Sequence, residues 1–296
     1  MTAVDRPLAT AQPASAPATL LRWPDILSAV IGVLMVFASL GGLFLHGLYR
    51  DNAWSTAAFR GNDLATLLLA VPVLAVALVL ARRGSDRARL VWFALLAYSV
   101  YNYAFYLFGT TFNDFFLLYA VLESLSLITL ALAIPAIAAI RWPVRRAPAR
   151  VVAGYMAVVG VVFGAMWITQ AVQFLISGTV PKVIVDSGLH TSIVFALDLT
   201  LIVPAMLTGA MLLWRGHPGG VVLGVVTNVV GALYMTALAV GGAFQARAGI
   251  SGATWAAPPY IELAITSLAA CWLLLHIPRT HARESLPRGK EADDGR

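Results

Sequence analysis

The sequence predicts an all-α integral membrane protein built as a bundle of about eight transmembrane helices. The chain has 296 residues, of which 60% are hydrophobic and 11% are charged, and its mean hydropathy is +0.82. A soluble domain carries about 25% charged residues because its surface faces water. This composition excludes a soluble fold, and two further observations, the length of the apolar runs and the distribution of basic residues, predict the same class.

Eight apolar runs are long enough for a helix that crosses the hydrocarbon core, which takes about 20 residues. Their expected limits are 26–48, 64–81, 90–108, 115–140, 151–178, 193–214, 221–245 and 261–277. The first run is longer than a secretory signal core of about 7 to 15 residues and lacks a clear cleavage site, so we expect an uncleaved span. Together the spans define a membrane domain over 23–278, between a disordered leader (1–22) and a disordered cytoplasmic tail (279–296).

Basic residues fall mainly on one side of the expected spans. The chain has 20 lysine and arginine residues; four of them lie on one side, which leaves 16 for the other, where both termini also lie. These four are Arg50, Arg60, Lys182 and Arg247. Because positive residues accumulate on the cytoplasmic side, we expect cytoplasmic termini and a location in a bacterial inner membrane. The outer connections then hold Asp51, Asp63, Asn113, Asp114, Asp186 and His190.

Two spans share a pattern that suggests an internal duplication. Pro72 and Pro204 are 132 residues apart (204 − 72), and each precedes an apolar stretch that ends in Arg and Gly. At nearly the same offset Tyr101 matches Tyr234. Halves over 23–140 and 151–278 would form a 4+4 parallel repeat, an arrangement found in some carriers. Chance similarity between helices rich in Ala, Leu and Val is the alternative.

Several classes of function are excluded or disfavoured by composition and motifs. The net charge of +6 comes from short clusters between spans, so no nucleic-acid partner is expected. Cys271 is the one cysteine, which leaves no disulfide within the chain. The sequence lacks HExxH, GxSxG, P-loop and dinucleotide-binding motifs, so an enzyme and a bound cofactor are not expected. His46 and His190, both outside the bundle interior, are weak candidates for a metal or haem.

Two carboxyl groups lie within the expected spans. An ionisable group in hydrocarbon costs about 2.5 to 3.5 kcal/mol, so it normally faces the interior of the bundle and has a partner. Asp198 stands six residues before Pro204, which cannot donate a hydrogen bond to the carbonyl of Thr200. Glu123 lies near the middle of the fourth span. We therefore expect Asp198 to be the main ion-binding or substrate-binding residue, with Asn102, Tyr106 or Glu123 as its partner.

Uncharged polar residues form further candidate faces. Tyr98, Asn102 and Tyr106 are spaced by four in the third span, and Tyr119 lies one turn before Glu123. Other polar groups near the outer half are Gln170, Gln173, Tyr234 and Glu262. These groups outline a polar cavity that is open toward the outside and binds a small molecule or an ion. The alternative is that they only hold helices together, with about 0.6 kcal/mol per contact.

A resemblance adds to this interpretation. The stretch from Tyr101 to Gly109, its continuation from Phe112 to Ser126, and the Asp198…Pro204 pattern resemble an uncharacterised family of multi-span proteins of bacterial cytoplasmic membranes. The resemblance covers most of the hydrophobic chain and implies no particular activity. Relatives usually have an apolar residue at the position of Glu123, whereas Asp198 follows the shared pattern.

Three functions fit these observations. We favour a small-solute or ion-coupled carrier or permease-like protein, because carboxyl groups within spans and proline-interrupted helices are common in carriers. The second hypothesis is a membrane sensor or assembly factor that binds a lipid or peptide without transporting it. The third is a quinone- or haem-linked redox protein. The oligomeric state does not follow from the sequence, and the lipid bilayer is the expected surrounding.

Overall fold

The computed structural model describes residues 22–140, 142–253 and 258–276. The described part is helical and contains no strand. The predicted leader (apart from Arg22) and the predicted tail over 279–296 lie outside the described residues. The helices are α1 (Arg22–Phe44), α2 (Ala53–Ala65), η1 (Thr66–Ala70), α3 (Val71–Arg82), α4 (Asp86–Gly109), α5 (Phe116–Ala138), α6 (Arg146–Ser177), α7 (Lys182–Ser187), α8 (Ile193–Leu197), η2 (Asp198–Ile202), α9 (Val203–Trp214), α10 (Pro218–Arg247) and α11 (Pro258–Leu275).

Within the described residues, eight helices are long and apolar enough to cross a membrane. Two of them are composite, because α2, η1 and α3 run on without a break over 53–82, and α8, η2 and α9 do so over 193–214. The predicted number of long apolar helices is therefore confirmed. The predicted start of the second span, residue 64, is wrong because the helix begins at Ala53. Its first turns carry Arg60, Asn62 and Asp63, which made this segment look like part of a connection.

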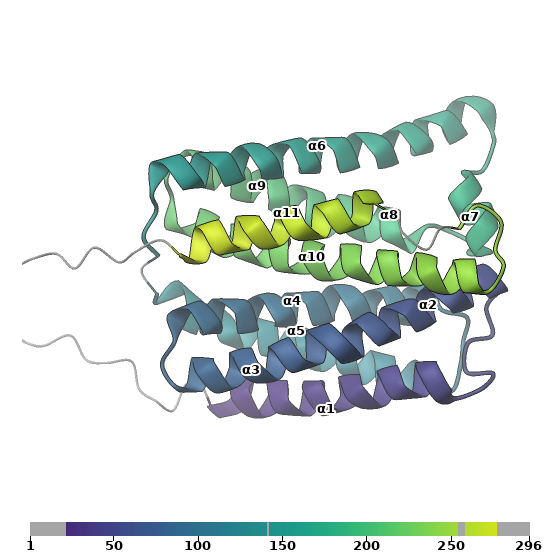
Figure 1. The fold of residues 1–296 in the computed structure, drawn as a ribbon, viewed down its shortest axis with the longest axis horizontal. Coiled ribbons are helices and arrows are strands. Elements are labelled where there is room, and N and C mark those ends of the chain that lie inside the picture. Colours follow the sequence, from purple (N-terminus) through teal and green to yellow (C-terminus); the bar gives the residue numbers. More distant parts are fainter. Residues whose placement is uncertain (1–21, 141, 254–257, 277–296) are drawn as a thin grey trace, which may run out of the picture.

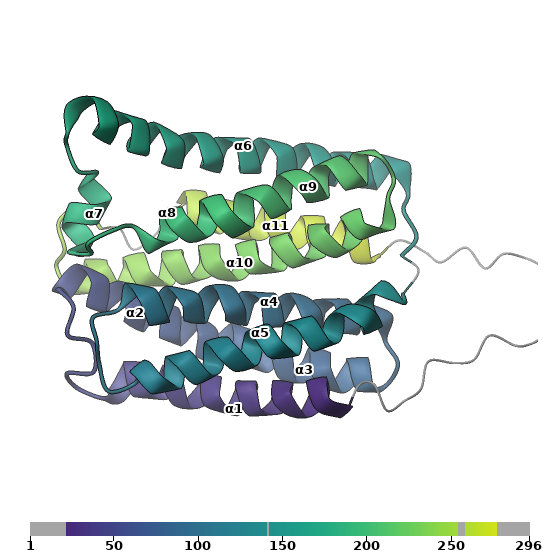
Figure 2. The same cartoon turned by 180° about the vertical axis from the view of Figure 1, so that it is seen from behind.

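The eight long helices form two neighbouring groups (Figures 1 and 2). Helices α1 to α5 make one group and α6 to α11 the other. Helix α4 of the first group faces α10 of the second where the groups meet. Helix α10 packs on both α2 and α4 and so forms most of the contact between the groups. Helix α1 begins and α11 ends at the same end of the bundle, which we call the terminal end; the opposite end, where α2 begins, is the distal end.

Both composite helices contain a π-helical segment immediately before a proline. The segment η1 ends two residues before Pro72, and η2 ends two residues before Pro204. A proline inside a helix has no N–H to donate and its ring clashes with the preceding turn, and π-helical turns are one way in which a helix absorbs such a break. Asp198 is the first residue of η2, so its carboxyl group sits where the regular helix is interrupted.

The two groups are in close backbone contact at Gly61 of α2 and Gly241 of α10. A β-carbon built on Gly61 would overlap the backbone of Gly241 and would lie 2.9 Å from the carbonyl carbon of Val240. The absence of a side chain at Gly61 is thus what lets the two helix backbones meet. This contact lies near the distal end, because Gly61 is in the first half of the composite helix and Gly241 is near the end of α10.

Candidate functional site

Asp198 is buried, with 2% of its surface exposed, and accepts two hydrogen bonds from uncharged donors. The Tyr101 hydroxyl of α4 donates to Oδ1 at 2.7 Å, and the Trp167 indole N–H of α6 donates to Oδ2 at 2.9 Å. None of the ion pairs between described residues includes Asp198. The carboxyl group therefore joins three helices without a positively charged partner.

Aromatic rings enclose these contacts. The Trp167 ring stacks on Phe195 with centroids 4.1 Å apart, and the Tyr101 ring contacts Tyr234 at 5.3 Å. Rings in these positions separate the carboxyl group from bulk water and strengthen its electrostatic interactions, because the local dielectric is low. The sequence pointed to Asp198 and Tyr234 but missed Tyr101 and Trp167 as ligands of the carboxyl group.

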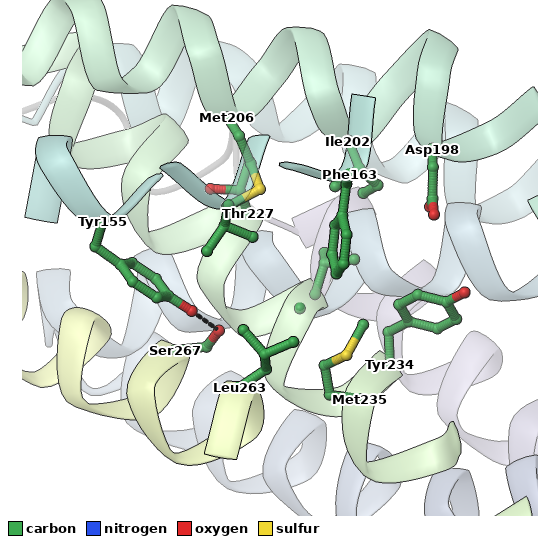
Figure 3. A pocket seen from close by; sticks show the side chains of 13 residues that line it. Tyr155, Phe163, Asp198, Ile202, Met206, Thr227, Tyr234, Met235, Leu263 and Ser267 are labelled. Atoms are coloured by element: carbon green, nitrogen blue, oxygen red, sulfur yellow. Dashed lines mark hydrogen bonds between the residues drawn. The ribbon is translucent and has the colours of Figure 1, made fainter. Parts of the chain in front are cut away.

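A small cavity adjoins Asp198 inside the second group of helices (Figure 3). Its volume is about 20 Å³, and Asp198 and Tyr234 lie at one end. At the other end Tyr155 and Ser267 form a hydrogen bond of 2.9 Å between their hydroxyls. Most of the remaining lining is apolar, including Phe163. A site that holds one water needs at least about 10 to 15 Å³. This cavity therefore accommodates a water molecule, with or without an extra proton, but not an organic solute.

The polar stripe on α4 is confirmed as one buried face, but it contacts α2 and η1 of the composite helix over 53–82. The Tyr98 hydroxyl pairs with Thr66 at 2.9 Å and the Asn102 amide oxygen accepts from Asn62 at 2.8 Å. In the third contact the Tyr106 hydroxyl donates to Asp63 at 2.8 Å. The expected contact of Asn102 or Tyr106 with Asp198 is therefore wrong. These residues share the other face of α4, while Tyr101 turns toward the second group.

Asp63 is the acidic residue that the sequence interpretation misplaced. The hydropathy pattern predicts an outer connection at Asp63, but the residue is 3% exposed and lies inside the composite helix. Its Oδ2 atom accepts from the Tyr49 hydroxyl at 2.5 Å and its Oδ1 atom from Tyr106. The uninterrupted run without proline from Ala53 onward, with Asn52 as a helix N-cap that accepts from the Ser55 N–H, is the signal that indicates an earlier start.

The other predicted site residues do not join a single cavity. Tyr119 is buried against Tyr106, with ring centroids 5.1 Å apart. Glu123 is half-buried one turn further along α5, and its Oε2 atom has no hydrogen-bond partner. Gln170 lines a separate hollow at the distal end of α6, and Glu262 is exposed near the start of α11. The candidate residues are thus divided between the two groups of helices and the surface.

The two histidines proposed as weak ligands are both exposed. His46 follows the end of α1, and His190 lies in the connection between α7 and α8. No group of three or more His, Cys, Asp or Glu side chains suited to a metal ion occurs among residues 22–140, 142–253 and 258–276. Neither histidine contributes to the buried polar contacts around Asp63 or Asp198.

A comparison of the chain with protein family models, curated proteins and solved structures finds no match. The architecture is that of a multi-pass helical membrane protein, with eight helices of sufficient length and apolarity in the described part of the chain. The function has to be inferred from the buried carboxyl groups and their surroundings.

Proposed function

We propose that the protein is an ion-coupled carrier of the cytoplasmic membrane and that Asp198 binds the coupling ion. The observation that carries this proposal is a buried carboxyl group whose described ligands are two neutral donors, Tyr101 and Trp167. A negative charge that is buried without a positive partner is costly. Binding of a proton or a monovalent cation removes this cost, and the energy gained is available to drive a change between two conformations.

The helix interruption beside Asp198 supports this role. Carriers often place their ion sites where a membrane helix is broken, because the break frees backbone carbonyls at the depth of the site. Here the π-helical segment η2 begins at Asp198, and Pro204 follows it. The adjoining cavity has room for a water molecule, with or without an extra proton. The shape therefore favours a proton as the coupling ion, with the solute bound in a more open conformation.

An internal 4+4 repeat also fits the arrangement. The segments η1 and η2 begin 132 residues apart (198 − 66), the same offset as their prolines. Helix α4 packs on α3 and α5 in the first group, as α10 packs on α9 and α11 in the second. Two halves of equal orientation, with α4 and α10 at their contact, would give the carrier a plane along which one half moves against the other.

The orientation of this carrier in the membrane follows the positive-inside rule. Arg82, Arg83, Arg146 and Arg215 lie at the terminal end of the bundle. This distribution supports an orientation with the terminal end in the cytoplasm and the distal end outside.

Proton flux into liposomes tests the proposal. Purified protein is reconstituted, a pH gradient is imposed, and a trapped dye reports the internal pH in the presence of candidate solutes. We expect wild-type protein to move protons together with a solute. Asp198→Asn keeps the size of the side chain and one acceptor oxygen but removes the ionisable carboxyl group that binds the ion. It should therefore abolish coupled flux at an unchanged expression level.

Two further variants complete this experiment. Glu123→Gln should reduce flux less than Asp198→Asn, because Glu123 is half-buried and outside the contacts of Asp198. Asp114→Asn is the matched control, since Asp114 is exposed at the distal end and pairs with Arg50. Wild-type flux in Asp198→Asn would show that the carboxyl group only holds α4, α6 and η2 together, and would exclude the proposed coupling.

A second candidate function rests on a hollow at the distal end of α6. This hollow has a volume of about 590 Å³ and combines the amides of Gln170 and Gln173 with the apolar Ile176 and Val180. A lipid or an amphipathic peptide, with polar and apolar parts side by side, matches such a lining. A sensor or assembly factor would bind such a ligand without transport, so saturable lipid binding in the absence of any solute-dependent flux would favour this function.

A further inference from the structure

A second buried carboxyl group, Asp63, lies in the first group of helices in surroundings that differ from those of Asp198. Its oxygens accept hydrogen bonds from Tyr49, which precedes α2, and from Tyr106 of α4. Tyr106 also lies 3.2 Å from the carbonyl oxygen of Phe59. On the side of α1, a β-carbon at Gly42 would collide with the carboxyl group, so the helix backbone itself closes the site.

The contact distances identify the ligand that this site can take. The two carboxyl oxygens are 2.5 Å from the Tyr49 hydroxyl and 2.8 Å from the Tyr106 hydroxyl, which are the lengths of strong O–H···O hydrogen bonds. A metal ion would have to push these oxygens apart against α1, α2 and α4. A proton needs no additional room, because it occupies a hydrogen bond that already exists.

Two unpartnered polar atoms give the cluster spare hydrogen-bonding capacity. Tyr119 is 1% exposed, and its hydroxyl lies beside that of Tyr49 without a hydrogen bond of good geometry. The Nδ2 group of Asn102 is also buried without an acceptor. Buried polar groups are normally paired. When the charge of a buried carboxyl group changes, its hydrogen bonds must rearrange, and nearby unpaired polar groups can then form new ones.

The charged and titratable groups around Asp63 come from four segments. Arg60 is one turn away on α2 and forms no ion pair with Asp63 in the described structure. Helix α1 presents Gly42. The tyrosines are Tyr49 before α2, Tyr98, Tyr103 and Tyr106 on α4, and Tyr119 on α5. Asp51, also before α2, interacts with Tyr119 and accepts hydrogen bonds from Thr111.

The layers above and below Asp63 indicate the side from which a proton arrives. Tyr49 belongs to the connection between α1 and α2 at the distal end. On α4, Asn102 lies one turn from Tyr106 toward the terminal end, and it accepts a hydrogen bond from Asn62, the neighbour of Asp63. The contact of Thr66 in η1 with Tyr98 follows further in the same direction. Beyond them follow fully buried apolar side chains: Ile31, Leu74, Leu95 and Leu96. This apolar layer separates Asp63 from the terminal end.

We infer that Asp63 is a second proton-binding site, separate from Asp198, and that it exchanges its proton with the distal side through Tyr49. In the uptake step Tyr49 Oη accepts a proton from the distal side while its own hydrogen moves to Asp63 Oδ2. The carboxylate becomes a carboxyl group, Tyr49 remains a neutral phenol, and one proton has been bound. Tyr106 and Tyr119 adjust their hydroxyl hydrogens to the new charge.

Infrared difference spectroscopy on the full-length protein in lipid nanodiscs tests this inference. Acidification should produce carbonyl-stretch bands of buried carboxyl groups. One band should be absent in Asp63→Asn and retained in Asp198→Asn, so the result does not depend on whether Asp198 couples transport. The same spectra in Asp63→Asn as in wild type would overturn the inference.

Tyrosine variants test the route and cover the case in which Asp63→Asn fails to fold. Tyr49→Phe and Tyr106→Phe each remove one hydrogen bond to the carboxyl group, so both should shift the frequency of the Asp63 band. After a rapid pH jump, Tyr49→Phe should also slow the appearance of this band about tenfold or more, because it removes the group that relays the proton. Tyr103→Phe is the control, since Tyr103 belongs to the same aromatic cluster without donating to Asp63. An unchanged band and rate in Tyr49→Phe would refute the proposed route.

Discussion

The close contact between α2 and α10 predicts that Gly61→Ala destabilises the protein. The new β-carbon would lie 2.5 Å from the Gly241 nitrogen and 2.9 Å from the Val240 carbonyl carbon, whereas carbon atoms pack at about 3.5 to 4.0 Å. The two helices would have to separate by about 1 Å. Overpacking of this kind costs about 1 to 3 kcal/mol, and the better helix propensity of alanine returns about 0.5 to 1 kcal/mol. The difference is a net loss of about 0 to 2.5 kcal/mol, and we expect a value in the upper half of this range because the β-carbon would meet backbone atoms.

Two matched variants isolate this steric effect. Gly241→Ala should cost less than Gly61→Ala, because its β-carbon meets Ala58 at the ordinary distance of 3.5 Å. Gly154→Ala should be neutral or stabilising, since nothing lies within 4 Å of a β-carbon there. The measurement is the free energy of unfolding in mixed micelles for each variant. Equal stability of Gly61→Ala and Gly154→Ala would show that α2 and α10 are not in the close contact described.

Two more predictions concern the ends of the bundle. Reporter fusions after Arg83, Arg146 and Arg215 should be cytoplasmic and fusions near Asn52, Lys182 and Gly252 should be external, and reversal at any two sites would contradict the proposed orientation. At the distal end, burial raises the pKa of the Tyr49 phenol well above its usual value near 10. The buried neutral phenol therefore contributes its full stabilisation below about pH 10. This contribution is lost as the pH rises from that value through the folded-state pKa, because at first only the unfolded chain ionises. Tyr49→Phe should therefore lose less stability than wild type in alkaline solution. An absorbance titration should show the same phenolate signal near pH 10 in both proteins, and a smaller signal in the variant would contradict the burial of Tyr49.

Both composite helices show how far periodicity and composition predict this fold. The expected span at 193–214 coincides with the helix in the structure, because its apolar residues begin directly after the cap residue Ser192. The expected span at 64–81 began too late, because Arg60 and Asp63 lower the hydropathy of a segment that is nevertheless helical and packed on α10. Hydropathy measures the average cost of placing a segment in lipid. It does not detect a polar side chain that a neighbouring helix satisfies.

The candidate sites also show what the sequence predicts and what it does not. A spacing of four residues correctly placed Tyr98, Asn102 and Tyr106 on one face of α4, since helical periodicity fixes which residues share a face. Periodicity does not specify which neighbour that face contacts. The Tyr106 hydroxyl donates to Asp63, whereas Tyr101, on the other side of the helix, donates to Asp198.

The sequence by itself determined the class of the protein and the number of its long apolar helices, because these depend on composition and on the length of each apolar run. It also identified Asp198, because a carboxyl group within an apolar run is costly wherever the helix packs. Only the tertiary structure decided that Tyr101 and Trp167 hold Asp198, and that Asp63 is buried between Tyr49 and Tyr106. These contacts join residues from different helices, and the rotation and packing of each helix against its neighbours are fixed only when the whole bundle has formed.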